Sequence, residues 1–151
     1  MKKQKYRKGF FAVVYKKQKN IFGKEKIKYL VLKRKLHWKG WEFPKGGIEN
    51  KEKIKDAIKR EIKEETGFYP KKIKKHNLSG RFKYSKKYKD RPDFIGQTYS
   101  LYSIELNTKN KIKVDRKEHK KYNWMDFKKA LNVLTWPNQK KCLKIVHKTL
   151  E

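Results

Sequence analysis

The sequence predicts an α/β fold, because segments typical of strands alternate with segments that have the periodicity of helices. Phe10–Tyr15 and Ile27–Leu32 are short and rich in β-branched and aromatic residues, as buried strands are. Four apolar residues between positions 54 and 62 recur at helical spacing and form one stripe that should pack on a sheet. The length and the absence of a repeat or boundary predict a single domain over residues 1–151.

The N-terminal half is expected to form a hairpin, a loop and then a helix. Turn residues at Asn20–Gly23 separate the two strands, so a hairpin is predicted there. Trp41–Gly47 is predicted to be a loop because it contains one proline and two glycines. The helix that follows has Asn50 as a favourable N-cap, Glu52 in its first turn and Gly67 as its stop signal.

The C-terminal half is expected to add strands and then two helices. Strands are predicted at Lys71–Asn77, Gln97–Leu106 and Tyr122–Trp124. Helices are predicted at Asp126–Leu134, capped by Asp126, and at Pro137–Leu150, with Pro137 in the first turn. Lys83–Pro92 has the most loop-like composition.

The net charge of +30 comes from 39 lysines and only 6 arginines, scattered along the whole chain. Such a field attracts polyanions such as nucleotides and RNA, although a lysine-rich genome would produce the same bias. Fixed phosphate and base recognition favours the guanidinium fork over a mobile ammonium. The charge therefore supports an anionic substrate more than it supports nucleic acid.

The sequence contains no feature that predicts a membrane or secreted protein. Apolar runs fall short of the roughly 20 residues that span a bilayer, and the basic N-terminus is not followed by an apolar signal segment. The single cysteine, Cys142, allows neither an internal disulfide nor a thiolate metal site. We expect a cytoplasmic protein with no membrane partner, and the oligomeric state stays open.

The acidic residues are concentrated in one segment. Of 15 acids, seven lie between Glu42 and Glu65, although the basic chain offers lysines everywhere for pairing. This concentration suggests a compensating cation. Mg²⁺ or Mn²⁺, bound by carboxylate oxygens and by the phosphates of a substrate, meets that need.

The segment Gly46–Phe68 reads GGIENKEKIKDAIKREIKEETGF. Gly46 is followed after five residues by Glu52, and after seven more by Arg60-Glu61-Ile62-Lys63-Glu64-Glu65-Thr66-Gly67-Phe68. This pattern resembles the signature of the Nudix hydrolase family, with every fixed identity and both bulky apolar positions met. The resemblance implies an α/β/α sandwich, with a mixed β-sheet between the helix of this cassette and the C-terminal helices.

The spacing of three glutamates supports a metal site independently of the family. Glu61, Glu64 and Glu65 are at i, i+3 and i+4, so their carboxylates share one helix face. Like charges this close repel and raise one another's pKa unless a cation neutralises them. The alternative is a solvated helix face with an Arg60–Glu64 pair. The glycine loop, Glu52 and Gly67 at fixed offsets favour the metal site.

The resemblance also implies roles for individual residues. The implied metal ligands are the carbonyl of Gly46 and the carboxylates of Glu61, Glu64, Glu65 and Glu118. Glu118 matches a glutamate outside the cassette that reaches the metals or acts as base in relatives. The catalytic carboxylate is expected among Glu61, Glu64 and Glu118, and Glu52 and Arg60 are expected to form a buried supporting pair.

Three further segments narrow the branch of the family. Trp41–Gly46 resembles the WxFPKG or WxFPQG loop of dinucleoside tetraphosphate hydrolases and RNA 5′-pyrophosphohydrolases, and Ile95–Gln97 resembles their GQ-containing strand. Glu118–Trp124 matches the EHxxYxW segment of diadenosine tetraphosphate hydrolases. Gly40 departs from the animal tetraphosphate hydrolases, which have a histidine there. Substrate binding is expected at Lys45, Gly47, Tyr84 and Tyr88, with a tyrosine stacking on the base.

Three functions follow, in order of preference. The first is asymmetric hydrolysis of diadenosine tetraphosphate to ATP and AMP with Mg²⁺ or Mn²⁺, and the second is removal of pyrophosphate from triphosphorylated RNA 5′ ends. The third is a non-catalytic nucleotide- or RNA-binding module. The complete set of cassette glutamates argues against the third, and the chain carries no cysteine or serine arrangement for a covalent route.

Overall fold

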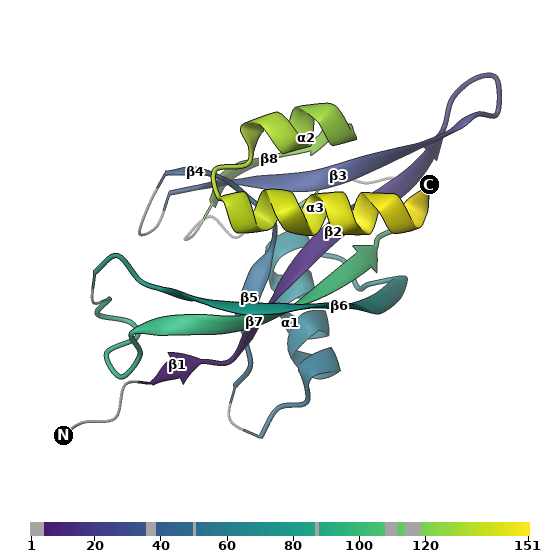
Figure 1. Cartoon of the computed structure of the whole chain (residues 1–151). Coiled ribbons are helices and arrows are strands. Elements are labelled where there is room, and N and C mark those ends of the chain that lie inside the picture. Colours follow the sequence, from purple (N-terminus) through teal and green to yellow (C-terminus); the bar gives the residue numbers. More distant parts are fainter. Residues whose placement is uncertain (1–4, 36–38, 50, 87, 108–111, 114–118) are drawn as a thin grey trace.

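A mixed β-sheet runs through the molecule with helices on both of its faces (Figure 1). The computed structural model describes residues 5–35, 39–49, 51–86, 88–107, 112–113 and 119–151. Within them the strands are β1 (Tyr6–Arg7), β2 (Gly9–Lys19), β3 (Glu25–Arg34), β4 (Gly40–Glu42), β5 (Lys45–Gly47), β6 (Lys72–Lys83), β7 (Gly96–Glu105) and β8 (His119–Met125). The helices are α1 (Ile54–Thr66), α2 (Phe127–Val133) and α3 (Pro137–Leu150).

Strand β2 lies at the centre of the sheet, and its two long neighbours were predicted as strands. It pairs in parallel with β7 and antiparallel with β3, while β6 continues the sheet beyond β7 and β8 pairs with β3. The β2–β3 hairpin turns at Asn20, whose side-chain oxygen accepts from the N–H groups of Phe22 and Lys24 at 2.9 Å. The predicted hairpin is confirmed.

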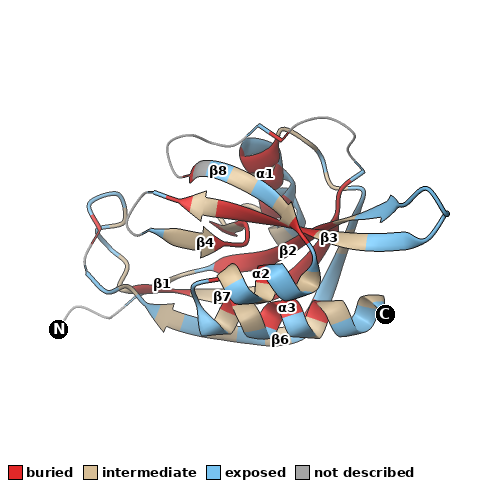
Figure 2. Cartoon of the chain, turned by 90° about the horizontal axis from the view of Figure 1, so that it is seen from above, coloured by how far each residue is buried: buried red, intermediate tan, exposed pale blue. Residues whose placement is uncertain are grey.

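Alternate residues of β2 build the two halves of the core. Phe10 and Val14 face α1, whereas Phe11 and Val13 face the layer of α2 and α3, and all are buried. Successive strand side chains point to opposite faces, so an uninterrupted apolar strand needs a cover on each side. Figure 2 shows the sheet between α1 and the pair α2 and α3. The expected α/β/α sandwich is confirmed.

Helix α1 begins later than the sequence suggests. The predicted N-cap, Asn50, lies outside the described residues, and the observed cap is Lys53, which makes no side-chain capping bond. Glu52 precedes the helix because its carboxylate is held by Arg60, while its own N–H donates to Glu49. The end of the helix is as predicted, with Gly67 in the left-handed conformation at φ 83°.

The segment Trp41–Gly47, predicted to be a loop, contains the short strands β4 and β5. Strand β5 pairs with β2, so that Lys45 lies opposite Phe11 and Gly46 opposite Phe10. Between β4 and β5, the carbonyl of Pro44 accepts from the N–H of Ala12 at 2.9 Å. The proline and glycines indicate a loop locally, but pairing with a strand much earlier in the chain overrides that preference.

The C-terminal elements follow the predictions closely. The carboxylate of Asp126 accepts from the N–H of Lys129 at 2.9 Å and caps α2, and Pro137 occupies the first turn of α3. Strand β6 extends past its predicted end at Asn77, because an irregularity between Lys75 and Ser79 lets its pairing with β7 resume. None of the described helices is long and apolar enough to cross a membrane.

Candidate active site

The start of the cassette lies directly against the side chain of Glu61. Strand β5 places Gly46 so that a Cβ on this residue would be 2.5 Å from the Cγ of Glu61. Only glycine therefore lets the backbone approach this carboxylate so closely. The side-chain nitrogen of Gln97 reaches the Gly46 carbonyl at 3.4 Å, which leaves that oxygen a second lone pair.

Arg60 connects helix α1 to Glu52 and to the end of strand β5. Its guanidinium donates two hydrogen bonds of 2.9 Å to Glu52 and one of 3.2 Å to the carbonyl of Gly47. This ion pair lowers the pKa of Glu52 to about 2. The two side chains are 17% and 25% exposed, so the expected pair is present but only partly buried.

The same guanidinium lies among further carboxylates. It donates to Glu61 at 2.9 Å and lies 3.6 Å from Glu49 and 3.7 Å from Glu64. We call Arg60 with Glu49, Glu52, Glu61 and Glu64 the Arg60 cluster. One positive charge cannot by itself neutralise four negative charges, so this cluster favours additional cations.

The cassette glutamates differ in their surroundings. Glu61 is 16% exposed and lines a cavity, Glu64 is 54% exposed, and Glu65 is buried at 3%. Within the described part of the chain, no three His, Cys, Asp or Glu side chains lie close enough together to hold one metal ion. Glu118 lies outside the described residues.

Gly46 and Glu61 form one wall of a cavity of about 390 Å³, which we call the glutamate cavity. Arg7, Arg34, Lys45, Arg91 and Gly47 also line it. Asp90 and Asp93 line it too, so its oxygen donors are the Gly46 carbonyl and three carboxylates, which are the donors that Mg²⁺ and Mn²⁺ prefer. These residues therefore fit the expected divalent ion.

A buried ion cluster lies beside this cavity and was not foreseen from the sequence. The carboxylate of Glu42, which is completely buried, lies 3.2 Å from Arg34, 3.3 Å from His119 and 3.5 Å from Lys45. Burial alone would raise the pKa of Glu42, but Lys45, His119 and Arg34 together lower it to about 2. Glu42 was expected to share the compensating cation of the acidic segment, whereas protein cations compensate it.

Lys45 is held between this cluster and an aromatic ring. Burial lowers the pKa of Lys45, and the neighbouring Glu42 opposes that shift. Its ammonium lies 5.3 Å from the centre of the Phe82 ring.

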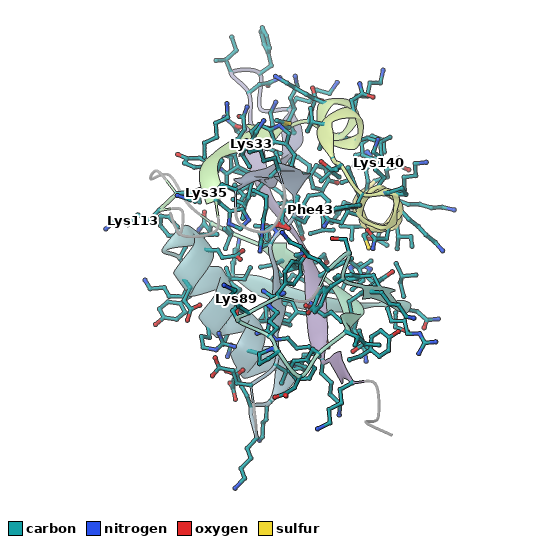
Figure 3. The ribbon with its side chains drawn as sticks, turned by 90° about the vertical axis from the view of Figure 1, so that its left-hand side faces the viewer. Lys33, Lys35, Phe43, Lys89, Lys113 and Lys140 are labelled. Carbon is teal, nitrogen blue, oxygen red and sulfur yellow. The ribbon has the colours of Figure 1, made fainter. Side chains whose placement is uncertain are left out.

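In the view from the side of the β6–β7 connection, Phe43 lies near the middle of the molecule, between α1 and α3 (Figure 3). The N–H of Phe43 donates to the side chain of Gln139 at 2.8 Å, and this bond attaches the connection between β4 and β5 to α3.

A second cavity, of about 250 Å³, opens on the other side of Lys45, and we call it the aromatic cavity. Five aromatic side chains line it, namely Phe11, Phe82, Tyr84, Tyr88 and Trp136. The rings of Tyr84 and Tyr88 are 5.0 Å apart, and the guanidinium of Arg91 lies 5.6 Å from the centre of Tyr84. The structure therefore brings both predicted tyrosines to one cavity together with Lys45.

The two cavities share one wall. Arg34, Lys45 and Arg91 line both the aromatic cavity and the glutamate cavity. A ligand with an aromatic base and an anionic tail would thus find rings at one end, three cations in the middle, and Gly46 with Glu61 at the other end. Gly47 faces the same space, but the guanidinium of Arg7 lies over it, where a Cβ would be.

The sequence profile described as NUDIX domain matches residues 5–144. The chain belongs to the Nudix family. The cassette Gly46–Phe68, with its glycine against Glu61 and its Arg60 cluster, is thus the candidate active site of a Nudix hydrolase.

Comparisons with known proteins agree with membership of the Nudix family. An RNA pyrophosphohydrolase from a Nitratiruptor species is 28% identical over an alignment of 169 positions, covering 98% of this chain and 97% of that protein. A structure of a C. elegans Ap4A hydrolase binary complex superposes with a TM-score of 0.72 at 22% identity, covering 95% and 97% of the two chains. The E. coli dihydroneopterin triphosphate pyrophosphohydrolase gives a TM-score of 0.72 at 20% identity, covering 92% and 94%.

Several residues at this site escaped the sequence analysis. Arg34 and Arg91 carry no local signal that distinguishes them from other polar residues on or between strands, and Gln97 was noticed only as part of the GQ-containing strand. Glu42 was noticed only as one acid among seven. His119 is part of the EHxxYxW segment, and the structure shows that its side chain contacts the buried carboxylate of Glu42.

Proposed function

We propose that this Nudix hydrolase removes pyrophosphate from the triphosphorylated 5′ ends of RNA. The main support for a polyphosphate substrate is the wall of Arg34, Lys45 and Arg91 that the aromatic and glutamate cavities share. RNA is placed first because a relative named RNA pyrophosphohydrolase aligns over nearly the whole chain. The net charge of +30 suits a long polyanion.

Diadenosine tetraphosphate is the second candidate substrate, with ATP and AMP as products. The match of Glu118–Trp124 to EHxxYxW favours it, and this segment places His119 against the buried Glu42. The structural likeness to an Ap4A hydrolase is compatible with both substrates, since it concerns the fold. Either substrate would put a base in the aromatic cavity and phosphates on the cationic wall.

We assign the metal ligands to the cassette and to Glu118. The carbonyl of Gly46 and the carboxylates of Glu61, Glu64, Glu65 and Glu118 would hold Mg²⁺ or Mn²⁺. When bound, such an ion neutralises phosphate charge and lowers the pKa of a coordinated water. Glu61, Glu64 or Glu118 would then accept the proton of the attacking water. Arg60 and Glu52 hold the loop of Gly47 on the helix.

The remaining roles concern the substrate. Lys45 and Arg34 are held in place by Glu42, so their charges face the phosphates without rearrangement. Gly47 leaves room for the guanidinium of Arg7, which can contact a phosphate in the cavity. Tyr84 or Tyr88 would stack on the base, since both rings line the aromatic cavity.

The decisive experiment is a substrate panel with and without metal. Triphosphorylated RNA, diadenosine tetraphosphate, nucleoside triphosphates and ADP-ribose are incubated with Mg²⁺, with Mn²⁺ and with a chelator, and the products are identified. We expect release of pyrophosphate from RNA at the highest rate, a steep decline of that rate with salt, and no hydrolysis with chelator. Faster release of ATP and AMP from diadenosine tetraphosphate would select the second candidate. Tight binding without any hydrolysis would leave only a binding module.

A further inference from the structure

One buried polar atom in the aromatic cavity has no partner. The side-chain oxygen of Asn138, which lines this cavity, is buried and accepts no hydrogen bond from any residue that the structure describes. Buried oxygens of this kind are nearly always paired in folded proteins. An unpaired acceptor at the wall of a ligand-sized cavity therefore indicates where an N–H group of a ligand would bind.

The position of Asn138 is fixed by its surroundings. It is the second residue of α3, directly after Pro137, which sets the backbone for the first turn. The next residue, Gln139, is buried and accepts from the N–H of Phe43 at 2.8 Å. Asn138 is thus a side chain placed by a rigid element, as a specificity contact requires.

The orientation of a nucleotide in the two cavities follows from the charges. The cations Arg34, Lys45 and Arg91 line both cavities, so the phosphates lie along them toward Glu61. The base then lies in the part of the aromatic cavity formed by the tyrosines and the start of α3. Its edge can reach Asn138 while its face lies on a ring.

We propose that Asn138 is the base-specificity residue of this cavity and that it selects adenine. This inference rests on the proposed nucleotide substrate. The Asn138 oxygen would accept from the N6 amino group of adenine, and its amide nitrogen would donate to N1 of the same edge. Guanine instead presents two adjacent donors, at N1 and N2, which a carboxylate matches. None of the described residues that line the aromatic cavity is acidic.

The test compares adenine and guanine in wild type and in variants. Binding of ATP and of GTP is measured by calorimetry without divalent metal, so that hydrolysis does not interfere. We expect wild type to bind ATP about tenfold to a hundredfold more tightly, the range that one bidentate base contact provides. N138A should bring the ratio of the two affinities close to one, and N138D should shift it toward GTP. The matched control is N132D, which adds the same charge on the exposed face of α2.

Using the ratio removes the general effect of an added negative charge on phosphate binding. Thermal unfolding of each variant establishes that it is folded, and an aspartate in the first turn of α3 is compatible with the helix dipole. Equal affinities of wild type for ATP and GTP would overturn the proposal, as would an unchanged ratio in N138D.

A second measurement separates this inference from the proposed hydrolysis. The kcat/KM values are compared for RNA pairs that begin with pppA or pppG, and for the diadenosine and diguanosine tetraphosphates. If wild type prefers ATP in binding but hydrolyses none of these substrates, the adenine site stands and the proposed function fails. Hydrolysis with equal kcat/KM for both bases would reject the adenine selectivity assigned to Asn138 and would leave the proposed hydrolysis unaffected.

Discussion

Two acidic regions lie side by side in this basic protein, and they are neutralised in opposite ways. The buried ion cluster encloses one carboxylate, that of Glu42, within 3.5 Å of Arg34, Lys45 and His119. The Arg60 cluster has the reverse composition, since one guanidinium lies within 3.7 Å of four carboxylates. The first region contains its own counter-charges, and the second has more carboxylates than guanidinium groups, at the edge of the cavity that Glu61 lines.

The contrast assigns different tasks to the two regions. A completely buried carboxylate is costly unless it is paired, so Glu42 acts mainly on stability and on the position of Lys45 and Arg34. The partly exposed carboxylates of the Arg60 cluster cost little in stability because water screens them. Their effect should appear in catalysis. Substitutions can test this division of tasks.

The largest effect is expected for E42Q. The change removes a buried carboxylate charge that lies within 3.5 Å of Arg34, Lys45 and His119, and breaking such a buried pair costs about 3–5 kcal/mol of stability. Urea unfolding at pH 7 measures the free energy. The matched control is E25Q on the exposed start of β3, which should stay within about 0.5 kcal/mol of wild type. An E42Q protein as stable as E25Q would remove the contrast between the regions.

The next effect is expected for E61Q, and it should appear in activity. Loss of the carboxylate that lies against Gly46 should lower kcat about a hundredfold to a thousandfold with little change in stability, as for removal of one transition-state contact. Steady-state hydrolysis of the best substrate of the panel measures it. D56N, an exposed carboxylate on the same helix, is the control and should keep full activity. Normal kcat in E61Q would refute the metal-site assignment.

A smaller effect is expected for R60K, which keeps the charge but loses the fork. The lysine cannot bind Glu52 twice and also reach Gly47, so the loop should lose its fixed position and kcat/KM should fall about tenfold. R81K, at an exposed arginine of β6, makes the same exchange away from the site. Equal losses in both variants would mean that the fork geometry of Arg60 has no special role.

The smallest effect concerns acid stability and compares Glu42 with Glu52. Both have a pKa of about 2 in the folded protein, below the ordinary value of 4.5. Each therefore contributes stability that is fully present above about pH 4.5 and is lost as the pH falls through about 2. E52Q should change stability at pH 7 by about 1 kcal/mol or less, because the pair lies near the surface.

Salt distinguishes the two contributions further. Unfolding free energies between pH 5 and pH 2 are measured at low and high ionic strength for wild type, E42Q and E52Q. We expect salt to reduce the contribution of Glu52, which is 17% exposed, and to leave that of Glu42, which is not exposed. A salt-sensitive contribution from Glu42 would mean that water reaches the buried ion cluster.

Agreement between sequence and structure is best where the pattern is local. The apolar run of β2, the stripe of α1, Asp126 as the cap of α2 and Gly67 as the stop of α1 all depend on residues within a few positions of one another. The disagreements arise where distant segments meet. Strand β5 forms because Lys45 pairs with Phe11, although its own residues favour a loop.

The sequence by itself determined the family and the cassette. The spacing of Gly46, Glu52, Arg60 and the three glutamates lies within one continuous segment that ends with α1. The sequence could not show which acids the protein neutralises internally. Two of the three partners of Glu42, Arg34 and His119, are 8 and 77 residues away, and Gln97 reaches Gly46 across 51 residues. Such pairs are joined by the order of strands in the sheet. Only the tertiary structure therefore separated the buried Glu42 from the candidate metal ligands and placed Asn138 in the cavity that Tyr84 and Tyr88 line.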